Sequence, residues 1–279
     1  MKSIISASRR TDIPAFFGDW FRQQVKAGMV AVPNPFSGKF YCVSLRPEDV
    51  GAFVFWSRDY RPFLPILDEI GDLYAERFVF HVTVTGYTQT ARDLLEPGVP
   101  LLADTLPALR ELARRHGKDR IFWRFDPIIF SDLTPPQERL ERFAGLAAIL
   151  HDVTERCYIS FVDLYGKVRR KFEQLEQTGR LRFWEPDLQR EIELAQEMRK
   201  IAEREHIRLF TCCENGVSAA SGITAGHCID APLLQKLFRD QQFADRLKPT
   251  RAGCGCYASR DIGCYHSCAH GCIYCYANR

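Results

Sequence analysis

The sequence lacks the features that mark membrane and secreted proteins. It contains no run of about 18 uncharged apolar residues, whereas a membrane-spanning helix needs about 20. Its first residues, MKSIISASRRTD, have neither the apolar core nor the small-residue cleavage site of a signal peptide. We therefore expect a soluble, cytoplasmic protein that does not associate with membranes.

The chain also lacks an excess of charge of one sign. Its 38 basic and 35 acidic residues leave a formal net charge of +3, and no segment indicates a nucleic-acid surface. Binding to nucleic acid is therefore unsupported, although it is not excluded. With 46% apolar residues among 279, the chain can bury a large core without disulfides, so we expect one large domain with appendages.

Cysteine is scarce in most of the chain and concentrated at its end. Residues 1–211 contain only Cys42 and Cys157, which we expect in the core. The other nine cysteines are Cys212, Cys213, Cys228, Cys254, Cys256, Cys264, Cys268, Cys272 and Cys275. Because cytosolic thiols stay reduced, metal binding or catalysis is a better interpretation than a disulfide framework.

Six short apolar runs rich in β-branched and aromatic residues alternate with longer segments of helical periodicity. The predicted strands are 3–8, 53–56, 78–84, 121–125, 157–162 and 208–212, and the predicted helices are 14–27, 62–74, 101–116, 136–151 and 188–205. Segments 30–33 and 39–45 predict a hairpin around the turn PNPFSG. This alternation predicts βα units and a parallel sheet.

Polar residues follow each predicted strand, and in a βα barrel such positions converge at one mouth. We therefore favour a partial (β/α)6 TIM-like barrel over a doubly wound sheet, with the barrel core in residues 1–215 and the hairpin inserted near 30–45. Each charged residue, taken singly, is equally well explained as an N-cap or a surface ion pair. The candidates for the mouth are Arg9, Arg10, Asp12, Arg58, Arg124, Asp126 and Asp163.

The chain ends in CAHGCIYCYANR, in which Cys268, Cys272 and Cys275 have the spacing C-x3-C-x2-C and Tyr274 precedes the last cysteine. Three close thiolates suit an iron-sulfur cluster or zinc. Structural zinc prefers four ligands, usually in C-x2-C pairs, which this spacing fits less well. A [4Fe-4S] cluster held by three thiolates leaves one iron open to a small molecule.

CAHGCIYCY resembles the signature of radical S-adenosylmethionine (SAM) enzymes, C-x3-C-x-aromatic-C. The resemblance implies a catalytic [4Fe-4S] cluster on the three cysteines, whose electron cleaves SAM to methionine and a 5′-deoxyadenosyl radical, and a full or partial βα barrel. It also implies a reducing partner such as ferredoxin or flavodoxin; the substrate is not indicated. The candidates for binding SAM are then Arg9, Arg10, Asp12, Arg58 and Tyr274, and those for catalysis are Arg124, Asp126 and Asp163.

The whole chain resembles an uncharacterised bacterial domain-of-unknown-function family. The matching stretches are SASRRTDIPAF, FWSRD, WRFDPI, SFVDLY, TCCEN, HCID and CGCYASRDIGCYHSCAHGCIYCYAN, of which the tail is also similar to spore photoproduct lyase. Radical SAM enzymes usually carry their cysteines after the first strand, where this chain has SRRTD. We therefore expect the iron-sulfur segment, residues 216–279, to fold back over the barrel mouth.

The remaining cysteines form a second candidate site. Cys212, Cys228, Cys254 and Cys256 supply four thiolates for a second cluster, as is frequent in radical SAM enzymes, and Cys264 is a spare candidate. Zinc tying the tail to the barrel and inert buried thiols are the alternatives. For the whole protein, a non-catalytic iron-sulfur redox protein and a barrel hydrolase or binding protein with structural zinc also remain open.

Three histidines complete the sequence-based expectations. We expect His266 and His270 to pack around the motif cysteines, or to donate hydrogen bonds to cluster sulfurs, and His81 to be a satisfied core residue.

Overall fold

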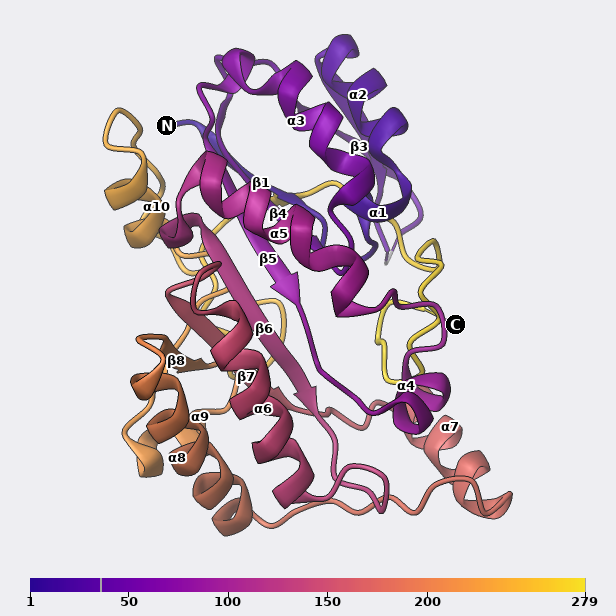
Figure 1. Ribbon diagram of the computed structural model, residues 1–279. Helices are drawn as coiled ribbons and strands as arrows, with labels where there is room; N and C mark the ends of the chain where they lie inside the picture. Colours follow the sequence, from indigo (N-terminus) through magenta and orange to yellow (C-terminus); the bar gives the residue numbers. More distant parts are fainter. Residues whose placement is uncertain (36, 279) are drawn as a thin grey trace.

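The computed structural model describes residues 1–35 and 37–278 and has an α/β fold built on one eight-stranded sheet (Figure 1). The strand order is β10-β1-β4-β5-β6-β7-β8-β9, and neighbouring strands are parallel. In the described part of the chain, β9 and β10 each pair with one strand only, so the sheet does not close on itself.

The six central strands are the six that the sequence predicts, which confirms those assignments. They are β1 (Ser3–Ala7), β4 (Val50–Ser57), β5 (Phe78–Thr83), β6 (Ile121–Ile128), β7 (Arg156–Phe161) and β8 (Arg208–Thr211). The edge strands β9 (Thr224–Ala225) and β10 (Arg260–Asp261) were not predicted, because two residues are too few to show any period. The predicted hairpin is confirmed as antiparallel β2 (Met29–Pro33) and β3 (Phe40–Ser44), although residue 36 of its turn lies outside the described residues.

Helices follow most of the central strands, and the five predicted helical segments are all helical. Segment 14–27 divides at Phe17, and segment 62–74 consists of α3 between two short 3-10 turns, η1 (Arg61–Phe63) and η2 (Asp72–Tyr74). Among the described residues no helix is both long and apolar enough to cross a membrane. The helices are α1 (Ile13–Phe16), α2 (Gly18–Ala27), α3 (Leu64–Ile70), α4 (Gln89–Leu95), α5 (Leu102–His116), α6 (Pro136–Leu150), α7 (Gly166–Gln177), α8 (Leu188–Arg204), α9 (Asn215–Ser221) and α10 (Ala231–Leu237).

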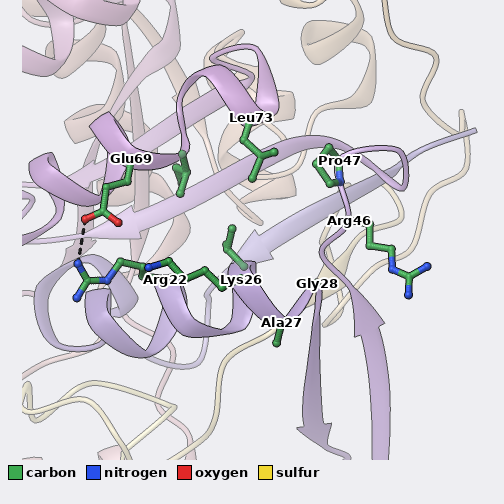
Figure 2. A pocket seen from close by; sticks show the side chains of 10 residues that line it. Arg22, Lys26, Ala27, Gly28, Arg46, Pro47, Glu69 and Leu73 are labelled. Carbon is green, nitrogen blue, oxygen red and sulfur yellow. Dashed lines mark hydrogen bonds and ion pairs between the residues drawn. The ribbon is translucent and has the colours of Figure 1, made fainter.

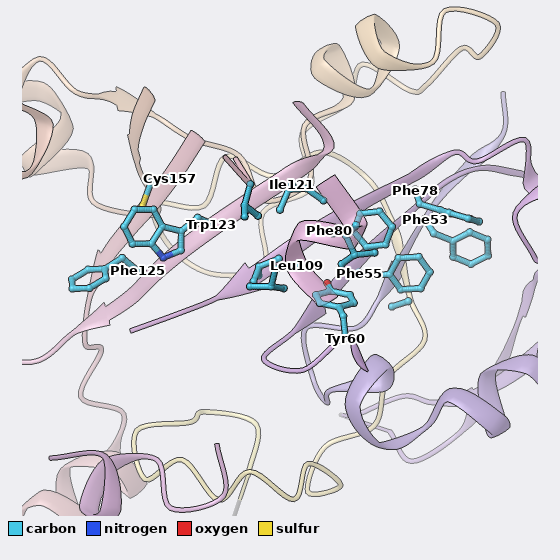
Figure 3. Packing of buried hydrophobic residues seen from close by; sticks show 14 of the residues in the cluster. Phe53, Phe55, Tyr60, Phe78, Phe80, Leu109, Ile121, Trp123, Phe125 and Cys157 are labelled. Atoms are coloured by element: carbon cyan, nitrogen blue, oxygen red, sulfur yellow. The ribbon is translucent and has the colours of Figure 1, made fainter. Parts of the chain in front are cut away.

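The two faces of the sheet are buried against different partners, because successive side chains of a strand point to opposite faces. In β4, Phe53 and Phe55 pack on one face against Phe21 of α2, and the crossover helices α3, α5, α6 and α8 cover the same face (Figures 1 and 3). Ala52 and Val54 lie on the other face. The crossover helices therefore leave the face that carries Ala52 and Val54 for other parts of the chain to cover.

That second face is filled by residues from the C-terminal part of the chain. The buried residues that pack there include Leu234 of α10, Phe238, Phe243, Cys254 and Cys256. The C-terminal segment is thus part of the hydrophobic core and also carries most of the cysteines.

His116, at the end of α5, is a buried histidine that the fold holds neutral. Its ring lies 4.9 Å from that of Phe80. Its Nδ1 lies 3.0 Å from Glu76 Oε2, yet neither ring nitrogen makes a hydrogen bond within the described chain. Burial, assisted by Arg120 and Arg115, lowers the pKa of His116 to about 4.

Stability should therefore fall as the pH falls from about 6.5 to about 4, because the unfolded chain takes up a proton that the native chain does not. We expect His116→Phe to flatten this part of the profile by roughly 1–3 kcal/mol. Urea unfolding at a series of pH values measures the effect, with the exposed His151 changed to Gln as the control. Equal slopes in both variants would contradict the prediction.

Candidate functional site

The C-terminal segment folds back onto the carboxyl end of β1. Strand β10 pairs with β1, and the Asp261 carboxylate accepts hydrogen bonds from Ser6 Oγ and Ser8 Oγ at 2.7 Å each. It also accepts from the Arg9 amide at 3.0 Å and from Arg10 Nε at 2.9 Å. Burial raises the pKa of Asp261, but Arg10 and these donors outweigh it and hold that pKa below its ordinary value.

The cysteine motif itself docks on the loops that follow β1 and β5. The Ile273 amide donates to Leu95 O at 3.0 Å, and the Gly98 amide donates to His270 O at 2.9 Å. The buried His270 ring bridges Gly98 O, at 3.0 Å from Nδ1, and Asp12 Oδ2, at 2.9 Å from Nε2. The end of the chain consequently lies beside α4 (Figure 1).

Asp12 is buried at the centre of this contact. Its Oδ1 caps α1 through the Ala15 amide at 2.9 Å and accepts from Ser57 Oγ at 2.7 Å. Its Oδ2 accepts from the Arg58 amide at 3.0 Å and faces His270. One carboxylate therefore connects the loop after β1, the end of β4 and the cysteine motif.

Arg58 and Glu96 form a buried ion pair beside the motif. Arg58 Nη2 lies 2.8 Å from Glu96 Oε1, and the Glu96 carboxylate also accepts from Thr85 Oγ1 and from the Tyr274 hydroxyl. Although burial lowers the pKa of Arg58, the charges of Glu96, Tyr274 and Cys272 raise it overall. The Arg58 side chain is 10% exposed, and its Nη1 has no partner among the described residues.

Sequence reasoning missed Glu96. In the stretch LLEPG a single glutamate has no pattern that would indicate burial, yet it is 2% exposed and contacts Thr85, Arg58 and Tyr274.

The three motif thiols lie close enough to interact electrostatically. Cys272 is buried and Cys268 and Cys275 are half-buried. Burial raises the pKa of Cys268 to about 11 and that of Cys272 to about 12. In the described chain no group of three or more His, Cys, Asp or Glu side chains is already arranged to hold a metal ion. The donor set is entirely sulfur with a fixed cation beside it, and this chemistry suits an iron-sulfur cluster.

The second set of cysteines gathers at the end of β8, with one member more than the sequence indicated. Cys212 Sγ and Cys228 Sγ lie 3.2 Å apart, and Cys256 interacts with Cys228 and with Cys254. The additional thiol is Cys213, which interacts with Cys212 and Cys254. In the sequence, only its position directly after Cys212 indicated that Cys213 could belong to this set.

The predicted catalytic pair on β6 borders this second set. Arg124 Nε donates to Asp126 Oδ2 at 2.8 Å, and Ser160 Oγ donates to the same carboxylate. Arg124 Nη1 also donates to Cys228 Sγ at 3.1 Å. Arg124 and Asp126 therefore form an ion pair next to Cys228.

The remaining candidates, Arg9 and Asp163, have different surroundings. The Arg9 side chain is near Cys256, Cys228 and Asp261. The half-exposed Asp163 pairs with Arg251 at the surface.

The prediction of a core position is confirmed for Cys157 and wrong for Cys42. In β3 the side chain of Val43 is buried, and the alternation of the strand turns Cys42 to solvent. Cys264 is also exposed. His81 is fully buried and its Nε2 lies 2.9 Å from Cys228 O, but its Nδ1 has no partner among the described residues.

A hollow of about 460 Å³ lies away from all these residues (Figure 2). Its lining includes Gly28 and Pro47, which precede β2 and β4, and Leu73, which precedes β5. It therefore lies towards the amino ends of the strands, opposite to the motif, and includes none of the predicted site residues.

The sequence matches the family model "Domain of unknown function (DUF1848)" over residues 4–277. The chain belongs to this family. Membership in DUF1848 confirms the predicted whole-chain resemblance to a domain-of-unknown-function family, and no curated protein matches the chain.

Similar solved structures include a protein from Bacteroides thetaiotaomicron VPI-5482 named provisionally as an alpha-L-fucosidase. It is 8% identical, with a TM-score of 0.32, and the match covers 86% of this DUF1848 chain and 96% of that chain. A likeness this low carries no argument about the fold or the activity of the DUF1848 protein.

Gly98 tests whether the motif docks as described. A Cβ there would lie 2.7 Å from His270 O and 2.9 Å from Ala269 O, and these backbone atoms cannot move without moving the motif. We expect Gly98→Ala to make the last residues at least about tenfold more sensitive to limited proteolysis, with unchanged far-UV circular dichroism. In the control Gly145→Ala, the new Cβ meets nothing within 4 Å. Equal protection in both variants would refute the docking.

Proposed function

We propose that this protein is a radical SAM enzyme, in which Cys268, Cys272 and Cys275 bind a [4Fe-4S] cluster at which SAM is reductively cleaved to start radical chemistry. The observation that carries the proposal is the position of these thiols beside the buried Arg58, whose Nη1 has no partner in the described part of the chain. When bound, the cluster supplies the electron that splits SAM. The substrate and the reaction on it are not indicated.

The chain's own residues would bind the cluster and enclose the site around it. The three thiols lose their protons when they become ligands, and the positive charge of Arg58 beside Cys272 favours that loss. Burial of Cys272 and Tyr274 excludes water, which protects a reactive radical from side reactions.

Arg58 is the best of the proposed SAM-binding residues, because its charged side chain lies beside the motif thiols and its Nη1 is a buried donor with no partner among the described residues. Arg10 is bound to Asp261, and both oxygens of Asp12 accept hydrogen bonds from protein donors. Nη1 of Arg58 is free to donate to the SAM carboxylate, while Glu96 holds the rest of the guanidinium in place.

The general arrangement of the fold also supports this proposal. The crossover helices lie on one face of the sheet, as they do in a partial (β/α)6 barrel, and the motif docks at the carboxyl ends of the strands, where barrel enzymes have their sites. Arg124 and Asp126 would orient the substrate from β6, whereas Asp163 would act from the rim. The proposed reductant is a ferredoxin or flavodoxin in the cytoplasm.

Replacing Cys268, Cys272 and Cys275 together with alanine should remove about four irons per chain and abolish formation of 5′-deoxyadenosine. Iron and acid-labile sulfide analysis after anaerobic reconstitution, followed by product analysis with SAM and dithionite, measures both. The control is Cys42→Ala, because Cys42 is exposed on the hairpin. Iron that binds without SAM cleavage in the unmodified protein would favour the redox-protein alternative, and surviving cleavage in the triple variant would overturn the site.

Arg58→Lys keeps the positive charge beside Glu96 but removes Nη1, the nitrogen proposed to donate to SAM. We expect SAM affinity to fall at least about tenfold with unchanged iron content, since a hydrogen bond to a charged group contributes about 1.5–3 kcal/mol. The change in the cluster's electron paramagnetic resonance signal on SAM titration measures the affinity. The control is Arg22→Lys on α2, because the partly exposed Arg22 pairs with Glu69. Unchanged affinity in Arg58→Lys would assign SAM binding to another residue.

A further inference from the structure

Five thiols form a closed ring, distinct from the motif thiols, where the C-terminal segment meets the end of β8. We call the ring formed by Cys212, Cys228, Cys256, Cys254 and Cys213 the five-thiol ring, and each member interacts with the next in this order. These thiols come from three stretches that are distant in sequence, so only the folded chain brings them together.

The ring is more tightly spaced than the motif. Cys212 Sγ and Cys228 Sγ are 3.2 Å apart, and the other neighbours in the ring are also close enough to interact directly. Cys272 and the other two motif thiols, by contrast, interact only through charge. Thiolates on a tetrahedral zinc ion lie roughly 3.8 Å apart, since zinc-sulfur bonds are about 2.3 Å. A four-iron cluster spreads its ligands over the corners of a larger body, so the ring's spacing is closer to that of zinc.

The surroundings of the ring supply charge and donors. Arg124 Nη1 donates to Cys228 Sγ at 3.1 Å, and the charge of Arg9 acts on Cys256 and Cys228. Two positive groups therefore face a site that would carry two negative charges with zinc bound.

Polar atoms without partners lie next to the ring in sequence. Thr211 Oγ1 and His227 Nδ1 are buried and have no hydrogen-bond partner among the described residues, and they adjoin Cys212 and Cys228. A Cβ on Gly255 would lie 2.5 Å from His227 Nδ1, so this nitrogen points at the loop between Cys254 and Cys256. These atoms are available as donors to metal-bound sulfur.

We propose that the five-thiol ring is a structural zinc site in which four of the five thiols bind one Zn²⁺ that fastens the C-terminal segment to the sheet. Four thiol protons leave to solvent as the ion binds, and the resulting charge of −2 is balanced by Arg124 and Arg9. Within the described residues, no three His, Cys, Asp or Glu side chains are already arranged to hold an ion. Binding therefore requires a small rotation of thiols that are already in contact.

The test uses the full chain, purified anaerobically from zinc-supplemented medium, and does not depend on the proposed SAM chemistry. We expect about one zinc per chain, and the triple motif variant should keep it. Cys228→Ala combined with Cys256→Ala leaves three thiols and should lose it. Cys42→Ala combined with Cys264→Ala is the matched control, because both thiols are exposed. Metal analysis and sulfide assay on all four proteins give the stoichiometry.

A measurement on the unmodified protein covers the case in which the ring variant does not fold. X-ray absorption at the zinc edge should give four sulfur neighbours at about 2.3 Å. The proposal is overturned if the triple motif variant retains iron and sulfide that the ring variant lacks, since the ring would then hold a second iron-sulfur cluster. It is equally overturned if neither metal is found, or if zinc is bound with nitrogen or oxygen neighbours.

Discussion

The hydrogen bond between Asp12 and His270 joins the beginning of the chain to its end, and the rest of the candidate site depends on it. Asp12 is held by its own helix cap and by the end of β4, so its position is set by the sheet. His270 lies within the cysteine motif and is held from its other side by Gly98 O. A motif in an irregular tail thereby acquires the rigidity of the strands on which it docks.

Buried charge around the motif is arranged in pairs, as the cost of an isolated buried ion requires. Asp261 faces Arg10, and Glu96 faces Arg58. The difference between the two pairs is informative. Asp261 is surrounded by donors from β1 and its loop, whereas Arg58, beside Cys272, retains a nitrogen with no partner among residues 1–35 and 37–278. The first pair fastens the tail, and the second leaves a donor available to a ligand.

The sequence predicted the central strands because continuous apolar runs with β-branched and aromatic residues mark buried parallel strands. It failed for α7, where Val168 and Phe172 are the only fully buried residues among twelve, too few to produce a stripe. It also failed where tertiary contacts alone decide. Glu96 is buried among residues distant in sequence, Thr85, Arg58 and Tyr274, and Cys213 joins the ring through contacts that no spacing rule encodes.

The position of the motif at the end of the chain follows from what the loop after β1 does. In the enzymes that the motif resembles, that loop carries the cysteines, whereas here its residues bind the tail: the Arg9 amide donates to Asp261, Thr11 accepts from Ser267, and Asp12 bonds His270. Under the proposed function the loop keeps its place beside the cluster but serves as a receptor for a segment delivered from the other terminus. Upstream of the motif, hydrophobic packing of residues such as Leu234, Phe238 and Phe243 against the sheet already holds the segment in place. The five-thiol ring lies in the same region, where α10 and residues 238–257 cover the sheet, and with zinc bound as proposed it would add a further attachment.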